Sequence, residues 1–296
     1  MLLARTVWLL VLLLPLAAWG ELKVVSSSSS TAMLVREIAG AHVGLTVLAP
    51  PDRDLHLLQV RPSMMRALRG ADLVTALGAD LEQGWLPLAI QQAANPRILP
   101  GRPGYFEAAA QVDLLQVGGR ADRSLGDVHP VGNPHINMDP LRMAQVGLAL
   151  AQRLAELDPQ HADDYHARAG AFGDRVAGRL ATWQKELASA PGVVSYHLDV
   201  LYLLQRFKVP LLGVLEPVPG VPPTASHLKG LTASLTGRQG VILYTTYQSE
   251  SAPKSLGRLL GWRIERLQLE PPLHADGGVY LEHIERWVRA LAGDGR

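Results

Sequence analysis

The sequence has no cysteine at any of its 296 positions. This absence excludes disulfide bonds, and it excludes attachment to a membrane through a lipid-modified cysteine behind a leader peptide. It also limits the chemistry of any metal site, because many protein zinc sites are built from thiolates. A metal site in this chain must use histidine nitrogens and carboxylate oxygens.

The chain also lacks an excess of charge of either sign, with 28 Lys and Arg against 27 Asp and Glu. Removal of a leader that contains Arg5 leaves 27 basic residues (28 − 1) and 27 acidic ones, so the remaining chain is neutral. Proteins that bind nucleic acid usually have a basic surface, and we therefore expect no nucleic-acid partner. Aromatic residues make up only 5% of the chain. No aromatic-lined pocket is evident, which disfavours a binder of organic solutes.

Long apolar runs are missing except at the N-terminus. There Arg5 precedes the apolar run Val7–Leu14, and small residues follow at 17–20. This order is typical of a secretory signal peptide over residues 1–20. A transmembrane anchor is the weaker alternative, because the run is short and no later stretch of about 18 residues is free of charge. We expect a mature chain that begins near Glu21 and resides in a bacterial periplasm.

The rest of the chain alternates between short apolar runs, which predict strands, and segments with helical periodicity. The helical segment Pro159–Ala188 has about thirty residues and reaches about 45 Å at 1.5 Å per residue. Because strands and helices alternate on both sides of it, we predict an α/β protein with two lobes joined by one long spine helix. Each lobe is expected to contain a mostly parallel sheet flanked by helices. The predicted units are the signal peptide (1–20), an N-terminal lobe (21–158), the spine (159–189) and a C-terminal lobe (190–296).

Two local predictions concern segments of the first lobe. Ser26–Ser30, between a strand and a helix, is expected to form a tight loop whose hydroxyl groups cap the helix. Leu81–Ala94 is expected to be one helix that tolerates Pro87 with a kink.

The stretch Gly126–Pro140 is rich in glycine and proline, so it is predicted to be a shaped loop and not a helix or a central strand. Asp139 and Pro140 have the residue types of a helix N-cap and first helical position. His135 therefore lies on a rigid loop just ahead of a helix, where a metal ligand could be held still. The alternative is a structural loop whose histidine bonds to backbone.

His56 and His197 occupy comparable positions, close to predicted strand ends, and Glu270 follows the last predicted strand. In open α/β sheets, ligands bind outside the carboxyl ends of the strands. If these residues converge with His135 between the lobes, they form a shell of three histidines and one carboxylate. This set suits Zn²⁺, whereas Mn²⁺ would more readily accept two carboxylates. The chain has no close-set ligand motif such as H-E-x-x-H.

These motifs resemble those of the zinc/manganese solute-binding proteins of bacterial ABC importers, and the resemblance runs from Leu22 to about Leu291. Its most specific part is the loop Gly126–Pro140, which contains Asp-Val-His-Pro at 127–130 and Gly-Asn-Pro-His at 132–135. The other matching segments are Asp54–His56, Arg61–Ser63, Arg69–Leu73, Val194–His197, Glu216–Pro223 and Gly277–Tyr280.

The resemblance implies that His56 and His135 are metal ligands of the first lobe and that His197 is a ligand of the second. In that family the fourth ligand is usually an Asp after the last strand. Here Glu270 stands where that residue is expected, and His274 and Asp276 in the same turn remain alternatives.

Many zinc-binding members also have a long His-rich insertion ahead of the residue that matches His135. It is missing here, and only His129 is present. We interpret His129 as a solvated loop histidine, with accessory metal capture as the alternative. Glu216 lies in a stiff proline-rich loop and is expected to hydrogen-bond a ligating histidine.

The resemblance predicts a periplasmic binding protein, not an enzyme, that captures Zn²⁺ or Mn²⁺ and delivers it to an ABC permease, acting as a monomer. The alternatives are a zinc-dependent hydrolase and a metal-binding adhesin. A catalytic zinc keeps an open position for water and needs a nearby base. Four protein ligands would fill the zinc shell, and no dedicated base is evident beside them.

Overall fold

The computed structural model describes residues 21–118, 129–217 and 220–293. The predicted signal peptide and the start of the central loop, residues 126–128, lie outside the described residues. No helix within the described ranges is both long and apolar enough to cross a membrane.

Each lobe has one four-stranded sheet in which every neighbouring pair of strands is parallel. The strand orders, β2-β1-β3-β4 and β6-β5-β7-β8, follow the same pattern, so all strands of a lobe end at the same edge. The predicted fold class is therefore confirmed. The strands are β1 (Leu22–Ser26), β2 (Val43–Val47), β3 (Leu73–Ala76), β4 (Tyr105–Glu107), β5 (Val193–Ser195), β6 (Leu211–Val214), β7 (Val241–Thr245) and β8 (Arg263–Leu267).

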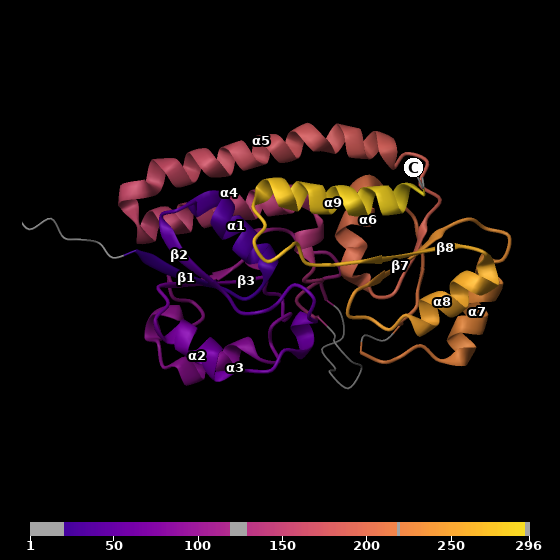
Figure 1. Cartoon of the computed structure of the whole chain (residues 1–296), viewed down its shortest axis with the longest axis horizontal. Coiled ribbons are helices and arrows are strands. Elements are labelled where there is room, and N and C mark those ends of the chain that lie inside the picture. The colour runs from indigo at the N-terminus through magenta and orange to yellow at the C-terminus, as the bar shows by residue number, and fades with distance from the viewer. Residues whose placement is uncertain (1–20, 119–128, 218–219, 294–296) are drawn as a thin grey trace, which may run out of the picture.

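Helices cover both faces of the first sheet, with α1 and α4 on one side and α2 and α3 on the other (Figure 1). The helix α5 has 25 residues, or about 37 Å at 1.5 Å per residue, and it runs along both lobes (Figure 1). The helices are α1 (Ser29–Ala39), α2 (Pro62–Arg69), α3 (Leu86–Ala93), α4 (Pro140–Leu157), α5 (Ala162–Glu186), α6 (Leu201–Phe207), α7 (Ala225–Leu235), α8 (Ser251–Leu260) and α9 (Gly277–Ala292).

The serine run has the predicted capping role. Ser28 is the N-cap of α1, and its side chain accepts a hydrogen bond from the backbone N–H of Thr31, which satisfies one of the free donors at the helix start. All five serines from Ser26 to Ser30 are buried. The run therefore includes the last residue of β1, a tight two-residue connection and the first two residues of α1.

Two predicted helices are shorter than expected. The segment after β3 forms turns, and α3 begins only at Leu86, so that Pro87 lies in the first turn and causes no kink. Proline costs no hydrogen bond there, because the first N–H groups of a helix have no partner within it. Glu82 turns inward instead and accepts hydrogen bonds from the backbone N–H groups of Leu77 and Gly78. The second shortened helix is the predicted spine Pro159–Ala188. Its first three residues form a 3₁₀ turn (Pro159–His161), and α5 covers only Ala162–Glu186.

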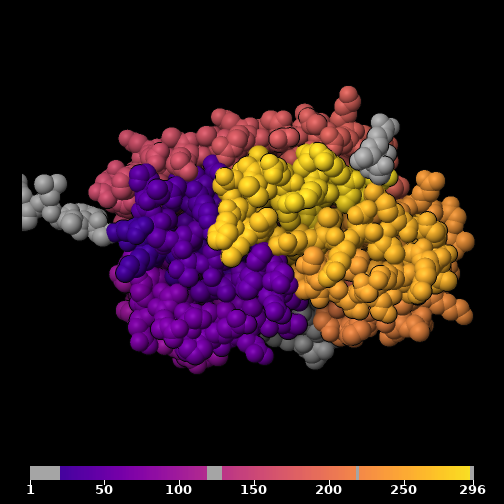
Figure 2. All heavy atoms as spheres, in the orientation of Figure 1, coloured from indigo at the N-terminus to yellow at the C-terminus, as the bar shows by residue number. Residues whose placement is uncertain are grey.

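One continuous core connects the two lobes. It contains buried side chains from α1 and α4 of the first lobe, from α5 and α9, and from α6 of the second lobe. Figure 2 shows α9, near the C-terminus, in contact with both lobes. The lobes are therefore held together by shared packing as well as by the spine.

Candidate metal centre

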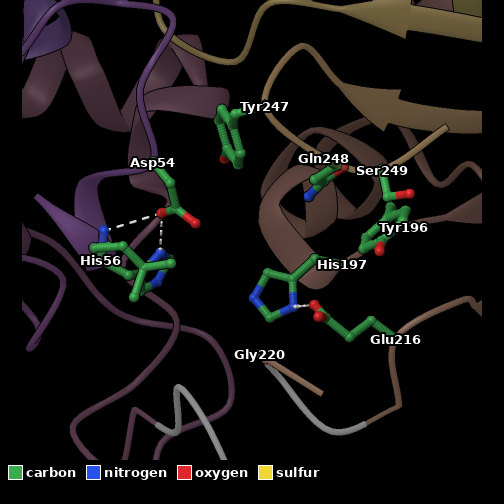
Figure 3. Close-up of a pocket in the computed structure, with 10 residues that line it drawn as sticks. Asp54, His56, Tyr196, His197, Glu216, Gly220, Tyr247, Gln248 and Ser249 are labelled. Carbon is green, nitrogen blue, oxygen red and sulfur yellow. Dashed lines mark hydrogen bonds and ion pairs between the residues drawn. The ribbon is translucent and has the colours of Figure 1, made fainter. Parts of the chain in front are cut away.

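The ends of strands from both lobes surround one cavity of about 210 Å³ between the lobes (Figure 3). Its position at the carboxyl ends of parallel strands is the one that α/β folds use for ligands. The cavity is lined by Asp54, His56, Leu57, Tyr196, His197, Glu216, Gly220, Tyr247, Gln248 and Ser249.

His56 lies in a short 3₁₀ turn, Leu55–Leu57, in the loop after β2. Asp54 caps this turn and accepts two hydrogen bonds from His56, one from the backbone N–H at 3.0 Å and one from Nδ1 at 2.7 Å. Burial raises the pKa of Asp54, but the hydrogen bonds and charge of His56 outweigh it and lower that pKa, so the carboxylate is ionised. An ionised carboxylate can only accept, which assigns the proton of His56 to Nδ1. The Nε2 atom of His56 therefore carries a lone pair, which can accept a hydrogen bond from Nε2 of His129, 3.0 Å away.

His135 lies on the central loop, immediately before the 3₁₀ turn Ile136–Met138. Only 3% of it is exposed, and its Nε2 has no hydrogen-bond partner among the described residues. Burial, together with the charges of His56, His197 and His129, lowers the pKa of His135 well below its usual range. The ring therefore stays neutral, which is the form that binds metals. A buried imidazole nitrogen without a partner is costly unless a ligand uses it.

His197 follows β5 in the second lobe and has a carboxylate beside it. Its Nδ1 lies 3.5 Å from Glu216 Oε2, which is longer than a well-formed hydrogen bond. Burial lowers the pKa of His197, but Glu216, Asp199 and Asp54 outweigh that effect and raise it above its usual value. Figure 3 shows the ring of His197 between Glu216 and His56. The predicted hydrogen bond between Glu216 and this histidine is therefore not formed, although the two side chains lie within ion-pair distance.

His129 is not a solvated loop histidine, so that prediction is wrong. It is half-buried, and its Nε2 lies 3.0 Å from Nε2 of His56. Two imidazoles on one tetrahedral zinc, with Zn–N bonds of about 2.0–2.1 Å, have their nitrogens about 3.3 Å apart. The spacing of these two nitrogens is therefore close to that of two ligands of one metal ion.

Four histidines thus form one cluster across the lobes. The ring centroids of His56 lie 5.1, 5.6 and 6.3 Å from those of His129, His135 and His197. His135 and His197 are 5.9 Å apart. Within the part of the chain that the structure describes, no three His or carboxylate side chains already have their donors arranged as around a metal ion. Metal binding therefore requires small ring movements, including loss of the hydrogen bond between His56 and His129.

Glu270, which follows β8, lines a small cavity together with His56 and His135. The carboxylate is only 2% exposed. Its Oε2 accepts hydrogen bonds from the Ser30 backbone N–H at 2.8 Å and from the Ser29 hydroxyl at 3.2 Å, and its Oε1 accepts one from Asn137 at 2.9 Å. Burial raises the pKa of Glu270 in spite of these donors. The residue lies beside the histidines, but the N-terminus of α1 holds one of its oxygens.

The two alternatives to Glu270 lie apart from these cavities. Asp276 is exposed and caps α9, where it accepts a hydrogen bond from the Val279 backbone N–H at 2.9 Å. His274 is exposed in the same turn. Neither residue lines the two cavities described above.

Sequence analysis missed the residues that hold the candidate ligands in place. Asp54, two positions before His56, could have been found because Asp often hydrogen-bonds to residues two positions ahead. Asp199 is buried and accepts a hydrogen bond from Gln248 at 3.0 Å, and no local pattern of the sequence indicates this contact. Asn137, which reaches Glu270 from the other lobe, has no such pattern either.

Metal affinity should fall as the pH is lowered, first through the titration of His197. Because the pKa of His197 is raised, its proton competes with metal at a pH where His135 is still neutral. Affinity should be highest above the pKa of His197 and should fall by about tenfold per pH unit below it, as expected for the release of one proton. Calorimetry in buffers of different ionisation enthalpy measures this proton release. Glu216→Gln should lower the pKa of His197 and move the pH dependence to lower pH, and an unmoved profile would contradict the assignment.

The fold and the cleft define a class of protein: a two-lobed binding protein with a cluster of histidines between its lobes. The model of the family described as "Zinc-uptake complex component A periplasmic" matches residues 24–293. The chain belongs to this family.

The chain is also similar to curated proteins of metal uptake and to solved structures. The chain is 26% identical over 244 residues to the high-affinity zinc uptake system protein ZnuA of Yersinia pestis, covering 77% of this chain and 76% of that protein. It is 22% identical over 203 residues to the metal ABC transporter substrate-binding lipoprotein ScbA of Streptococcus cristatus, covering 66% of this chain and 62% of that one. Among solved structures, FpvC of Pseudomonas aeruginosa in complex with Mn²⁺ has the same fold, with a TM-score of 0.78 and 23% identity over 92% of this chain and 97% of that one.

Proposed function

We propose that this protein captures Zn²⁺, with Mn²⁺ as the alternative metal, outside the cytoplasmic membrane and delivers it to the permease of an ABC importer. The observation that carries the proposal is the interlobe histidine cluster, in which His135 Nε2 is buried without a partner among the described residues. ZnuA of Yersinia pestis is named as part of a zinc uptake system and ScbA as a metal ABC transporter substrate-binding lipoprotein, and both names support the proposed function. The leader over residues 1–20 would bring the chain to the periplasm, where we expect it to act as a monomer.

The proposed ligands are His56, His135, His197 and Glu270. Three neutral imidazoles and one carboxylate match the ligand preferences of Zn²⁺ better than those of Mn²⁺, which favours oxygen. The carboxylate also supplies negative charge in a buried site, where a dication held only by neutral groups would be poorly stabilised. Glu270 would have to turn partly away from Ser29 and Ser30 to reach the metal. His129 is the alternative fourth ligand, because it already lies beside His56.

Release of the metal would come from local movements of loops. The shared core of α1, α5, α6 and α9 opposes a wide opening of the lobes. The side chains that must move on binding, His56 and Glu270, both lie on segments that follow strands.

A zinc hydrolase is the first rival. It would need a metal-bound water and a general base. The carboxylates nearest to the histidines are already engaged: Asp54 holds His56, and Glu216 faces His197. The family to which the chain belongs is also named for zinc uptake and not for hydrolysis. Adhesion is the second alternative function, and it would not require a buried histidine cluster between the lobes.

The test uses the mature chain beginning at Glu21, stripped of metal and titrated with zinc. We expect one zinc per chain, displacement of bound Mn²⁺ by Zn²⁺, and zinc uptake by cells that depends on both this protein and one permease. The X-ray absorption spectrum of the bound zinc gives its coordination number from the edge and the number of imidazole ligands from the extended fine structure. Three histidines with a bound water, together with hydrolytic activity, would overturn the transport function in favour of the hydrolase.

A further inference from the structure

The side chain of Asn133 joins the segments that carry His135 and His197. Its Oδ1 accepts a hydrogen bond from the His135 backbone N–H at 3.0 Å. Its Nδ2 donates to the carbonyl of Leu198, the residue after His197, at 2.8 Å. Because the His135 N–H can only donate and the Leu198 carbonyl can only accept, these two partners fix which end of the Asn133 amide is oxygen and which is nitrogen. A single side chain thus spans the boundary between the two lobes directly behind two proposed metal ligands.

Tyr202 of α6 holds the same loop from the second lobe. Its hydroxyl donates to the carbonyl of Asn133 at 2.6 Å and accepts from the backbone N–H of Leu115 at 3.0 Å. The side chain is fully buried. A buried hydroxyl that both donates and accepts uses most of its hydrogen-bonding capacity, so its position is well determined.

An ion pair strengthens the attachment one helical turn further along α6. Arg206 donates to both oxygens of Asp139, from Nε at 3.0 Å and from Nη2 at 2.6 Å. Asp139 is fully buried and also caps α4, where it accepts a hydrogen bond from the Leu141 backbone N–H. Two parallel bonds between an arginine and a carboxylate fix direction as well as distance. The central loop is therefore bound to α6 at Asn133 and at Asp139.

His56 is held differently. Between described residues, the hydrogen bonds of His56 and its turn go to other residues of the first lobe. Asp54 caps the turn, Nε2 of His129 lies 3.0 Å from Nε2 of His56, and Trp85 Nε1 donates to the Leu55 carbonyl at 2.8 Å. Leu57 beside it is 71% exposed at the rim of the cavity. None of these bonds fixes the distance from His56 to His197.

We propose that Asn133 and Tyr202 are positioning residues that hold His135 and His197 as a preformed pair, to which His56 adds as the adjustable ligand. The proposal rests on the proposed metal-binding function. Holding two ligands in place before the metal arrives lowers the entropy lost on binding, so it should increase affinity mainly by slowing metal release. The metal would then leave by way of His56, whose turn is attached only to its own lobe.

Tyr202→Phe tests the proposal, because it removes one hydroxyl from a buried ring and leaves every proposed ligand intact. The matched control is Tyr165→Phe in α5, where an equally buried tyrosine donates its hydroxyl to Asp158 at 2.5 Å. Loss of groups that orient metal ligands typically lowers affinity 10–100-fold. We expect zinc affinity to fall about tenfold in Tyr202→Phe, mostly through faster release, and to stay unchanged in Tyr165→Phe. Asn133→Ala, which removes both bridging bonds, should have a larger effect than Tyr202→Phe.

The visible absorption spectrum of the Co²⁺-loaded protein is the second readout, because it reports ligand geometry. It should change in Tyr202→Phe and Asn133→Ala but not in the control, and chemical denaturation of the metal-free proteins measures the stability lost in each. Equal zinc release rates and spectra in Tyr202→Phe and the unaltered protein would overturn the positioning role. So would equal losses of affinity in the two Tyr→Phe variants, since these would reflect stability alone. Failure of the unaltered protein to bind zinc would instead overturn the proposed function.

Discussion

His135→Ala should weaken zinc binding at least a hundredfold, or about 2.8 kcal/mol at about 1.4 kcal/mol for each factor of ten. The substitution removes a neutral imidazole whose Nε2 is buried and has no partner among the described residues. Removal of groups that merely orient ligands already costs 10–100-fold, and the loss of a ligand should cost more. Competition with a chelating indicator of known affinity measures the change.

Two other histidines serve as comparisons. His161→Ala alters a histidine in the turn between α4 and α5, bonded to Asp158 at 2.7 Å, and should leave zinc affinity unchanged. His129→Ala removes the neighbour of His56 and should weaken binding only slightly if Glu270 is the fourth ligand. Equal losses in His129→Ala and His135→Ala would mean that the central loop supplies two ligands instead of one.

The fold could be predicted from the sequence because its signals are local. Apolar runs such as Val241–Thr245 alternate with helical segments, and parallel strands joined by helices follow from that alternation. The strand-end positions of His56 and His197 then followed from the rule that ligands bind at this edge of an α/β sheet. The position of Glu270 after the last predicted strand followed in the same way, and the resemblance to a known family supported it as the fourth ligand.

Contacts between segments far apart in the chain could not be predicted. Asn133 meets Leu198 across 65 positions, and Glu270 meets Ser30 across 240. Both contacts depend on how the two lobes pack, and no periodic pattern encodes that. The position of His129 could not be predicted for the same reason. A histidine in a glycine- and proline-rich loop is usually solvated, and only the folded chain brings this one to His56. The start of α3 could not be predicted either, because Glu82 points inward and accepts a hydrogen bond from the hydroxyl of Ser27, 55 positions earlier.

The charges around the cluster bear on which group completes the metal shell. Asp54, Asp199 and Glu216 lie close enough to His197 to raise its pKa. These carboxylates provide negative potential, but Asp54 and Glu216 are already paired with the Nδ1 atoms of His56 and His197. Glu270 is the buried carboxylate that shares a cavity with His56 and His135. We therefore propose that Glu270 both neutralises and ligates the dication.

Glu270→Gln should lower zinc affinity at least tenfold, or about 1.4 kcal/mol, while the fold survives. The change replaces an anionic ligand by a weaker neutral oxygen in a buried site, where charge complementarity matters most. The new amide oxygen can keep the hydrogen bond from the Ser30 backbone N–H. The new amide N–H can donate to Asn137 after that side chain flips, because Asn137 Oδ1 has no partner among the described residues. Zinc titration and thermal unfolding of the metal-free variant measure the two effects separately.

Asp276→Asn is the matched control for Glu270→Gln. It makes the same carboxylate-to-amide change six positions along the chain, at an exposed helix cap, and an asparagine can still accept the hydrogen bond from Val279. Its zinc affinity should remain that of the unaltered protein. If Asp276→Asn lowers zinc affinity and Glu270→Gln does not, the fourth ligand is Asp276 and not Glu270. If both are silent and His129→Ala is strongly impaired, the metal is held by four histidines, and Glu270 serves only to bind the N-terminus of α1. If all three variants bind zinc normally, three histidines leave one position open to water, and the hydrolase becomes the better explanation of the site.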